Sequence, residues 1–219
     1  MNNLNQHRWG IVLAGGEGRR LHQFLKTEYG TDSPKQFCSI LGDRSMLRRT
    51  IDRAQLVIPN ERVVTVITKH HIAYANKDLY DRPRGTVVIQ PEGRETGPAI
   101  LLPLLYIRRF DPQAQVVIFP SDHFVEQEER FMEYVDSVFR FTAALPGYIN
   151  LLGIPAHGIN DGYGWIEPGD YLGYSSGVKL YQVKSFAEKP VVSTHPESNT
   201  RNISGTLLRW SVAFRYSWI

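Results

Sequence analysis

Cysteine is nearly absent from this chain of 219 residues, in which Cys38 is the only one. A single cysteine excludes an intrachain disulfide framework and a zinc site made of cysteines, and it suits a reducing compartment. Long apolar runs are missing too, since none approaches the roughly 20 residues that a membrane-spanning helix needs. The polar start from Met1 to Arg8 also lacks the apolar stretch of a signal peptide. We therefore expect a cytoplasmic protein with no membrane partner.

An excess of charge of one sign is absent as well. The chain has 25 Lys and Arg against 22 Asp and Glu, which leaves a net charge of +3. Such a near balance argues against a nucleic-acid partner. Hydrophobic residues make up 42% of the chain and charged residues 21%, as in ordinary globular proteins. The length suits one domain with a well-buried core.

Strand and helix patterns alternate along the chain. Short apolar runs predict strands over residues 9–14, 62–68, 86–90, 114–119 and 149–154. Alternating apolar and polar residues predict a half-exposed strand over 179–187. Apolar residues at helical spacing predict four helices: from an N-cap at Ser45 to Pro59, over 72–80, over 98–110 and around 131–139. Pro103 should kink the third of these helices or shift its start. The alternation predicts an α/β fold, a Rossmann-like, mostly parallel sheet with helices on both faces. Ligands then bind beyond the carboxyl ends of the strands.

A glycine-rich segment follows the first predicted strand, with the sequence Leu13-Ala14-Gly15-Gly16-Glu17-Gly18-Arg19-Arg20-Leu21. Glycines let the backbone approach a ligand and turn N–H groups toward phosphate oxygens, and arginines add positive charge. Two better-known phosphate loops do not match. Leu21 stands where a dinucleotide fingerprint needs glycine or alanine, and the P-loop's Gly-Lys pair is absent. A strand-to-helix turn without any ligand remains the alternative.

Residues 15–35 show no clear helical or strand period, so we expect an ordered functional loop. It ends in Ser33-Pro34-Lys35-Gln36-Phe37. Lys35 is suited to meet negative charge that develops on phosphorus, although a solvated surface lysine is the commoner case. His22 and the pair His70-His71 have no carboxylate at ligand spacing, and we give them no role.

The combination LAGGEGRRL followed by SPKQF resembles the signature of the sugar-1-phosphate nucleotidyltransferases. The Lys-Gln-Phe ending is most similar to that of mannose-1-phosphate guanylyltransferases, the GDP-mannose pyrophosphorylases. Four further segments resemble the family and occur in its order: residues 90–99 (QPEGRETGPA), 120–123 (PSDH), 162–167 (GYGWIE) and 186–190 (FAEKP). Each segment alone also fits an ordinary turn, core aromatic or solvated ion pair.

The resemblance implies a nucleotide-diphospho-sugar transferase fold and the transfer of a nucleotidyl group from GTP to a hexose 1-phosphate, mannose 1-phosphate, with Mg²⁺ as cofactor. It also implies roles for individual residues. Arg20 and Lys35 would be catalytic, and Asp122 would bind the metal. Gly164, Glu188 and Lys189 would bind the sugar phosphate. The nucleotide would be bound by Leu13, Ala14, Gly15, Gly16, Gly18, Arg19, Gln90, Arg94, Thr96 and Ser121.

The resemblance ends after Pro190. The family continues with a Trp-Asn motif and a later metal-binding aspartate, whereas no Asp follows Asp170 here. We therefore expect residues 1–8 to be disordered, residues 9–190 to form the nucleotidyltransferase domain, and residues 191–219 to be an atypical, truncated segment whose apolar ending has no partner. Loss of a metal carboxylate weakens transition-state stabilisation. The alternatives are a non-catalytic nucleotide- or sugar-phosphate-binding homologue, or an inactive truncated fragment. The sequence indicates no oligomeric state.

Overall fold

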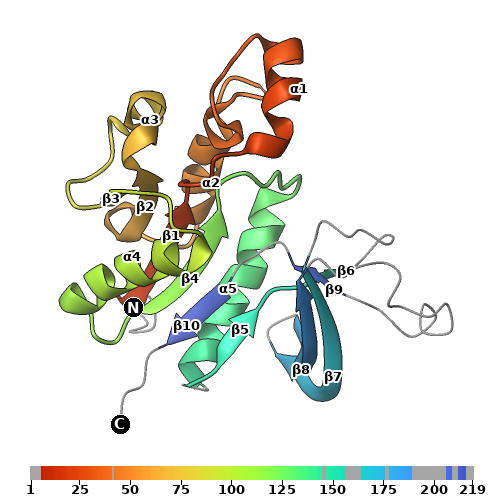
Figure 1. Cartoon of the computed structure of the whole chain (residues 1–219). Helices are drawn as coiled ribbons and strands as arrows, with labels where there is room; N and C mark the ends of the chain where they lie inside the picture. The colour runs from red at the N-terminus through yellow and green to blue at the C-terminus, as the bar shows by residue number, and fades with distance from the viewer. Residues whose placement is uncertain are drawn as a thin grey trace, which may run out of the picture.

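The computed structural model describes residues 6–40, 42–144, 147–155, 164–175, 178–188, 206–208 and 212–215. These residues form two sheets (Figure 1). The main sheet has the strand order β3-β2-β1-β4-β10-β5, and the second has the order β6-β9-β7-β8. Figure 1 shows the second sheet beside the β5 end of the main sheet, on the side away from β3. The expected α/β fold is confirmed.

The parallel part of the main sheet consists of β1 (Arg8–Leu13), β2 (Val63–Thr68), β3 (Val87–Gln90) and β4 (Gln115–Pro120). β1 is central, with β2 on one side and β4 on the other. β2 is buried along its whole length, as a strand covered on both faces should be. The apolar sequence runs predicted all four strands: β1, β2 and β4 are buried along most of their length, whereas β3 at the edge of the sheet is only partly buried. Arg8, expected in a disordered tail, is already the first residue of β1.

Helices and short 3₁₀ turns connect the strands. Alternate residues of the sheet bury opposite faces. Val12 and Phe119 pack in one core cluster with residues of α2, α3 and α5, whereas Ile11 and Ile118 pack in another with residues of α4. The helices are α1 (Arg19–Tyr29), α2 (Met46–Ala54), α3 (Ile72–Leu79), α4 (Thr96–Phe110) and α5 (Glu128–Ala144), and the turns are η2 (Lys35–Phe37), η3 (Asn60–Arg62) and η4 (Lys69–His71).

Two helix details test the sequence predictions. The side chain of Ser45 accepts a hydrogen bond from the backbone N–H of Arg48 at 3.0 Å, which confirms it as the N-cap of α2. α4 begins at Thr96, two residues before Pro98, and continues through Pro103, which is buried. None of the helices among the described residues is long and apolar enough to cross a bilayer.

The prediction of a loop over residues 15–35 was wrong, because α1 occupies half of that segment. Gly18 and Gly30 flank the helix, and both have left-handed φ values, of 63° and 62°. Leu25 is buried, whereas Leu21 and Phe24 are 38% and 52% exposed. Without a continuous buried stripe, the helix has little of the apolar periodicity that identifies amphipathic helices in a sequence.

The predicted strand over residues 149–154 is divided between the two sheets. β5 (Ile149–Leu151) joins the main sheet, and β6 (Ile154–Pro155) joins the second. The predicted strand over 179–187 is β8 (Val178–Glu188), and it forms an antiparallel hairpin with β7 (Gly164–Ser175), which was not predicted. The register of β7 shifts three times, so its side chains do not alternate regularly.

The C-terminal segment contributes a strand to each sheet. β9 (Thr206–Leu208) pairs with β6 and β7, and β10 (Val212–Arg215) lies antiparallel between β4 and β5. The expectation that the apolar ending has no partner was therefore wrong for residues 212–215. Backbone hydrogen bonding to two neighbouring strands is the physical reason, and a sequence pattern does not reveal such distant pairing.

Candidate functional site

The glycine-rich segment is fixed at the carboxyl ends of three adjacent parallel strands. Ser121, directly after β4, donates to the backbone carbonyl of Leu13 twice, from its N–H at 3.2 Å and from its hydroxyl at 2.6 Å. The N–H of Ala14 donates to the carbonyl of Val66 in β2 at 2.8 Å. Carboxyl ends of parallel strands meet at one edge of a sheet, where α/β proteins bind ligands. Leu13, Ala14 and Ser121 lie at that edge.

Gln36 holds the glycine-rich segment through two hydrogen bonds to its backbone carbonyls. Its Nε2 donates to the carbonyl of Ala14 at 3.0 Å and to that of Gly16 at 2.7 Å, and the residue is only 3% exposed. η2 also approaches Gly18, because a Cβ atom added there would lie 3.2 Å from the backbone nitrogen of Lys35. Gln36 belongs to the SPKQF motif, but no role was predicted for it. Its place next to Lys35 was the only feature of the sequence that pointed to it.

Lys35 and Asp122 are brought together across the sheet edge. The Nζ of Lys35 lies 3.5 Å from Oδ2 of Asp122, although the residues are 87 positions apart in the sequence. The Lys35 side chain is 17% exposed and that of Asp122 is 45% exposed. His123 lies close as well, with its Nε2 3.7 Å from Oδ1 of Asp122. A partly buried cation beside an accessible carboxylate can bind a phosphate and a metal ion next to each other.

The residues predicted to face the nucleotide base divide into two groups. Gln90 is buried at the end of β3, and a Cβ atom on Gly15 would lie 3.4 Å from its Oε1, so it joins the glycine-rich segment. The Nη2 of Arg94 pairs with Oε2 of Glu92 at 3.1 Å, and the Arg94 side chain is 74% exposed. Thr96 is exposed at the start of α4.

Of the residues predicted to bind the sugar phosphate, Gly164 and Glu188 lie on the second sheet. Gly164, the first residue of β7, pairs in register with Glu188, the last residue of β8. Lys189 lies outside the described residues. The backbones of Arg19 and Arg20 form the start of α1, directly after Gly18. The structure therefore brings the backbones of Gly164 and Glu188 together.

His71 follows the carboxyl end of β2, and its sequence context suggested no role for it. It ends η4 and is 6% exposed. Burial lowers the pKa of its imidazole, and the negative charge of Glu17 partly opposes this shift. The ring packs edge-on against Phe37, with centroids 5.4 Å apart. No ligand spacing in the sequence pointed to it.

A family model for nucleotidyl transferases matches residues 9–207 of the chain. The chain belongs to the nucleotidyl transferase family. The mannose-1-phosphate guanylyltransferase of Escherichia coli is 29% identical over 187 residues, which are 84% of this chain and 39% of that protein. The xanthan biosynthesis protein XanB of Xanthomonas campestris pv. campestris is 31% identical over 186 residues, 84% of this chain and 37% of that protein. The chain thus spans less than two-fifths of these relatives.

Solved structures support the family and the fold. The mannose-1-phosphate geranyltransferase of Thermus thermophilus is similar with a TM-score of 0.78 and 25% identity, over 95% of this chain and 57% of that one. The mannose-6-phosphate isomerase of Helicobacter pylori gives a TM-score of 0.70 at 19% identity, over 95% of this chain and 70% of that one, which shows the fold alone. The resemblance on which the site predictions depend is therefore confirmed.

Asp122 supplies a carboxylate that fits a magnesium ion in the site of this nucleotidyl transferase. It offers half-exposed oxygen atoms next to the proposed phosphate site. Mg²⁺ prefers oxygen ligands, keeps several waters, and is often held by one or two carboxylates together with substrate phosphates. Over the part of the chain that the structure describes, no three His, Cys, Asp or Glu side chains gather into a complete protein-only metal site.

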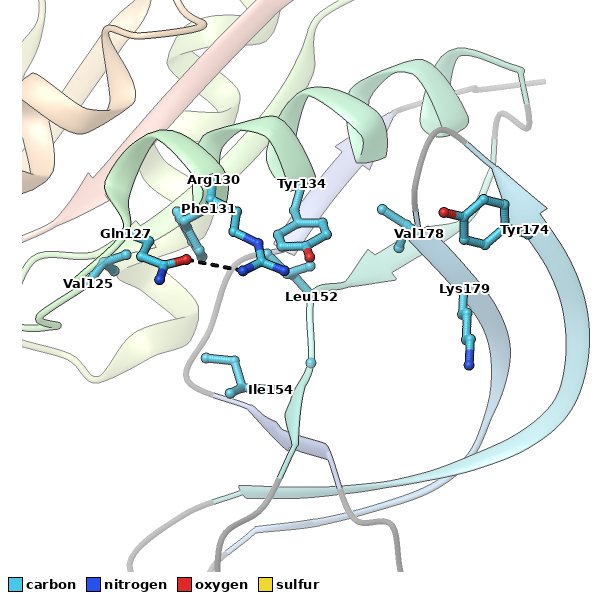
Figure 2. A pocket seen from close by; sticks show the side chains of 11 residues that line it. Val125, Gln127, Arg130, Phe131, Tyr134, Leu152, Ile154, Tyr174, Val178 and Lys179 are labelled. Atoms are coloured by element: carbon cyan, nitrogen blue, oxygen red, sulfur yellow. Dashed lines mark hydrogen bonds between the residues drawn. The ribbon is translucent and has the colours of Figure 1, made fainter.

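A pocket of about 540 Å³ lies away from these residues (Figure 2). It is bounded by the start of α5, the β5–β6 connection and the end of the β7–β8 hairpin. Arg130 and Lys179 are its only charged lining residues among those described, and both are exposed. Figure 2 shows Arg130 beside Tyr134, with Nη1 bonded to Oε1 of Gln127 at 3.2 Å. None of the predicted site residues lines this pocket.

Proposed function

We propose that this chain transfers a guanylyl group from GTP to mannose 1-phosphate. A phosphate oxygen of the sugar phosphate attacks the α-phosphorus of GTP and forms a new P–O bond. The bond from the α-phosphorus to the oxygen that bridges it to the β-phosphorus breaks, and pyrophosphate leaves with the electron pair. The products are GDP-mannose and pyrophosphate. The observation that carries the proposal is the 3.5 Å approach of Lys35 to Asp122, beside the glycine-rich segment.

This displacement requires little covalent chemistry from the protein, so positioning and charge neutralisation carry it. The backbone of Gly15 to Gly18 and the cationic Arg20 would bind the triphosphate. Lys35, held by η2 next to Gly18, would neutralise charge that develops on the transferred phosphate. Its partial burial strengthens that interaction, because fewer waters screen the ammonium group.

Asp122 would hold Mg²⁺, which, when bound, neutralises phosphate charge and polarises the reacting phosphate. The protein contributes the position of the carboxylate. Asp122 follows Ser121, whose two hydrogen bonds to Leu13 connect the end of β4 to the end of β1. This connection keeps the carboxylate at a fixed place relative to the glycine-rich segment.

The choice of substrates is supported by the relatives and by the site. Several of the similar proteins are mannose-1-phosphate guanylyltransferases by name. Gln90, buried beside Gly15, supplies an amide suited to the ribose or to the edge of guanine. Gly164 and Glu188 start and end a hairpin that would contact the sugar phosphate. A cytoplasmic location suits the single cysteine, and the proposal includes neither a nucleic acid nor a membrane as partner.

Calorimetry with GTP, ATP and UTP in the presence of Mg²⁺ tests the nucleotide part of the proposal. We expect the wild-type chain to bind GTP most tightly and Lys35→Ala to lose at least about tenfold in affinity, equivalent to about 1.4 kcal/mol. Lys77→Ala is the matched control, because Lys77 is an exposed lysine on α3. Absence of binding for all three nucleotides, or equal losses for the two variants, contradicts the proposal. Binding without pyrophosphate release supports a non-catalytic homologue instead.

A further inference from the structure

We propose that Gln36 is a positioning residue for the nucleotide, which fixes two peptide groups of the glycine-rich segment so that their N–H groups face the triphosphate. The inference rests on the proposed function and adds to it a side chain that acts through the backbone of the segment. Gln36 is the middle residue of η2, directly after Lys35. One short turn therefore carries both the proposed phosphate-binding cation and the side chain that holds the segment.

The side-chain amide of Gln36 uses both of its N–H donors on the segment. Its Nε2 lies 3.0 Å from the carbonyl oxygen of Ala14 and 2.7 Å from that of Gly16. Both partners are carbonyl oxygens, which only accept, so the amide nitrogen and not the amide oxygen must face them. Because the residue is 3% exposed, little water competes for these two hydrogen bonds.

The two hydrogen bonds determine where the following N–H groups point. No peptide bond in the described part of the chain is cis, and in a planar trans peptide the carbonyl and the next N–H point in opposite directions. The carbonyls of Ala14 and Gly16 face Gln36, so the N–H groups of Gly15 and Glu17 point away from it. Gln36 is buried, whereas Gly16 and Glu17 are exposed, so that direction leads to the open side of the segment. Backbone N–H groups held in place on an open side bind an anion without reorganisation.

The segment also leaves room for a phosphate. A Cβ atom added to Gly16 would meet no atom within 4 Å in the described part of the chain. A Cβ atom added to Gly18 would instead lie 3.2 Å from the backbone nitrogen of Lys35 and 4.0 Å from Oε1 of Gln36. The segment is therefore packed against η2 at Gly18 and open at Gly16, between the two peptide groups that Gln36 fixes.

η2 itself is anchored in the core, independently of the Gln36 amide. Phe37 is 1% exposed and belongs to the same core cluster as Ala14. Its ring stacks on Tyr74 of α3 with the centroids 6.0 Å apart, and its N–H donates to the carbonyl of Pro34 at 2.9 Å. Loss of the amide donors therefore releases the segment while the turn and Lys35 stay in place.

Gln36→Met tests the inference, because methionine keeps the length and the approximate volume of the side chain but has no N–H donor. The matched control is Gln113→Met, at an exposed glutamine just before β4. Calorimetry with Mg²⁺ gives the affinities for GTP and for inorganic triphosphate, which carries phosphates without a base or ribose. Mannose 1-phosphate is titrated separately, and thermal unfolding reports on stability.

We expect Gln36→Met to weaken the binding of GTP and of inorganic triphosphate by the same factor, about tenfold, because both ligands need the oriented N–H groups. Gln113→Met should stay within about twofold of the wild type for both ligands. The affinity for mannose 1-phosphate should be the same in the wild type and in both variants.

Three results would overturn the inference alone. A loss for GTP without a loss for inorganic triphosphate would show that Gln36 acts on the base or the ribose. An unchanged GTP affinity with a lower unfolding temperature would show a purely structural role. A wild-type chain that binds GTP but not inorganic triphosphate would show that the segment does not recognise phosphates. A wild-type chain that binds no GTP overturns the proposed function itself, and the inference with it.

Gln36→Asn takes the place of Gln36→Met if the methionine variant does not fold. Asparagine keeps the amide but is one methylene shorter, so its nitrogen cannot reach both carbonyls unless the backbone moves. We expect the affinities for GTP and inorganic triphosphate to fall together, by about threefold or more, since at least one of the two hydrogen bonds is lost. Affinities equal to those of the wild type would contradict the positioning role.

Discussion

Replacement of Gly18 by Ala perturbs the point where the glycine-rich segment meets Lys35. Gly18 has a φ of 63°, in the left-handed region that a side chain enters at a cost of about 1–2 kcal/mol. The added Cβ would also lie 3.2 Å from the backbone nitrogen of Lys35, which is tighter than most real contacts of a Cβ atom. η2 has to move by a few tenths of an ångström to relieve it.

Gly30 provides a control that separates these two effects. It has a φ of 62° at the other end of α1, and an added Cβ would have no atom within 4 Å. Gly30→Ala therefore carries the dihedral cost alone, about 1–2 kcal/mol, or roughly 2–8 °C in unfolding temperature for a chain of this size. Gly18→Ala carries the same cost together with the displacement of Lys35.

The two variants should thus differ in function more than in stability. We expect Gly18→Ala to lose roughly tenfold in GTP affinity, about 1.4 kcal/mol, while Gly30→Ala stays near the wild type. Calorimetry measures the affinities, and differential scanning calorimetry measures the unfolding temperatures. Equal GTP affinities for the two variants would show that the approach of Gly18 to Lys35 has no part in nucleotide binding.

Two further variants test local strain and charge. Glu95 has φ 57° and ψ −170°, a region of backbone conformation occupied almost only by glycine. Glu95→Gly should therefore raise the free energy of unfolding by about 1 kcal/mol in denaturant titrations, whereas the control Glu92→Gly should not. A lower free energy of unfolding for Glu95→Gly would contradict backbone strain at this position. Burial raises the pKa of Asp78, so the folded state holds its proton more tightly than the unfolded state, and stability falls as pH rises through the folded pKa. Asp78→Asn should therefore be more stable than the wild type at pH 7 and lose that advantage at pH 4. The control is Asp43→Asn, at an exposed position, which should not show this pH-dependent gain in stability. An equal gain in stability for Asp78→Asn at both pH values would contradict a role for the buried charge of Asp78.

Local patterns were sufficient for the parallel half of the fold. β1, β2 and β4 are apolar runs because both of their faces are covered, and such runs are visible in a sequence. α1 was not visible because its apolar side chains remain largely exposed. β10 was not visible because its pairing with β4 connects residues nearly a hundred positions apart, which no local period encodes.

The candidate site also contains residues that the sequence identified and residues that only the tertiary structure revealed. Lys35 and Asp122 belong to motifs of the family, and the structure brings them within 3.5 Å. Gln36 donates to two backbone carbonyls of the glycine-rich segment, so its role depends on geometry that appears only after folding. Arg94 was predicted from a motif and stays a prediction, and in this structure its side chain pairs with Glu92. A motif identifies residue types, whereas the tertiary structure determines which of them meet.

Release of pyrophosphate from GTP and mannose 1-phosphate is the decisive measurement of guanylyl transfer. We expect the wild-type chain to release pyrophosphate with Mg²⁺ only when both substrates are present, together with an equal amount of GDP-mannose. Lys35→Ala and Asp122→Asn should reduce the rate at least about a hundredfold, equivalent to about 2.7 kcal/mol of transition-state stabilisation, and Lys77→Ala should not. No pyrophosphate from a folded wild-type chain that binds GTP would contradict the account.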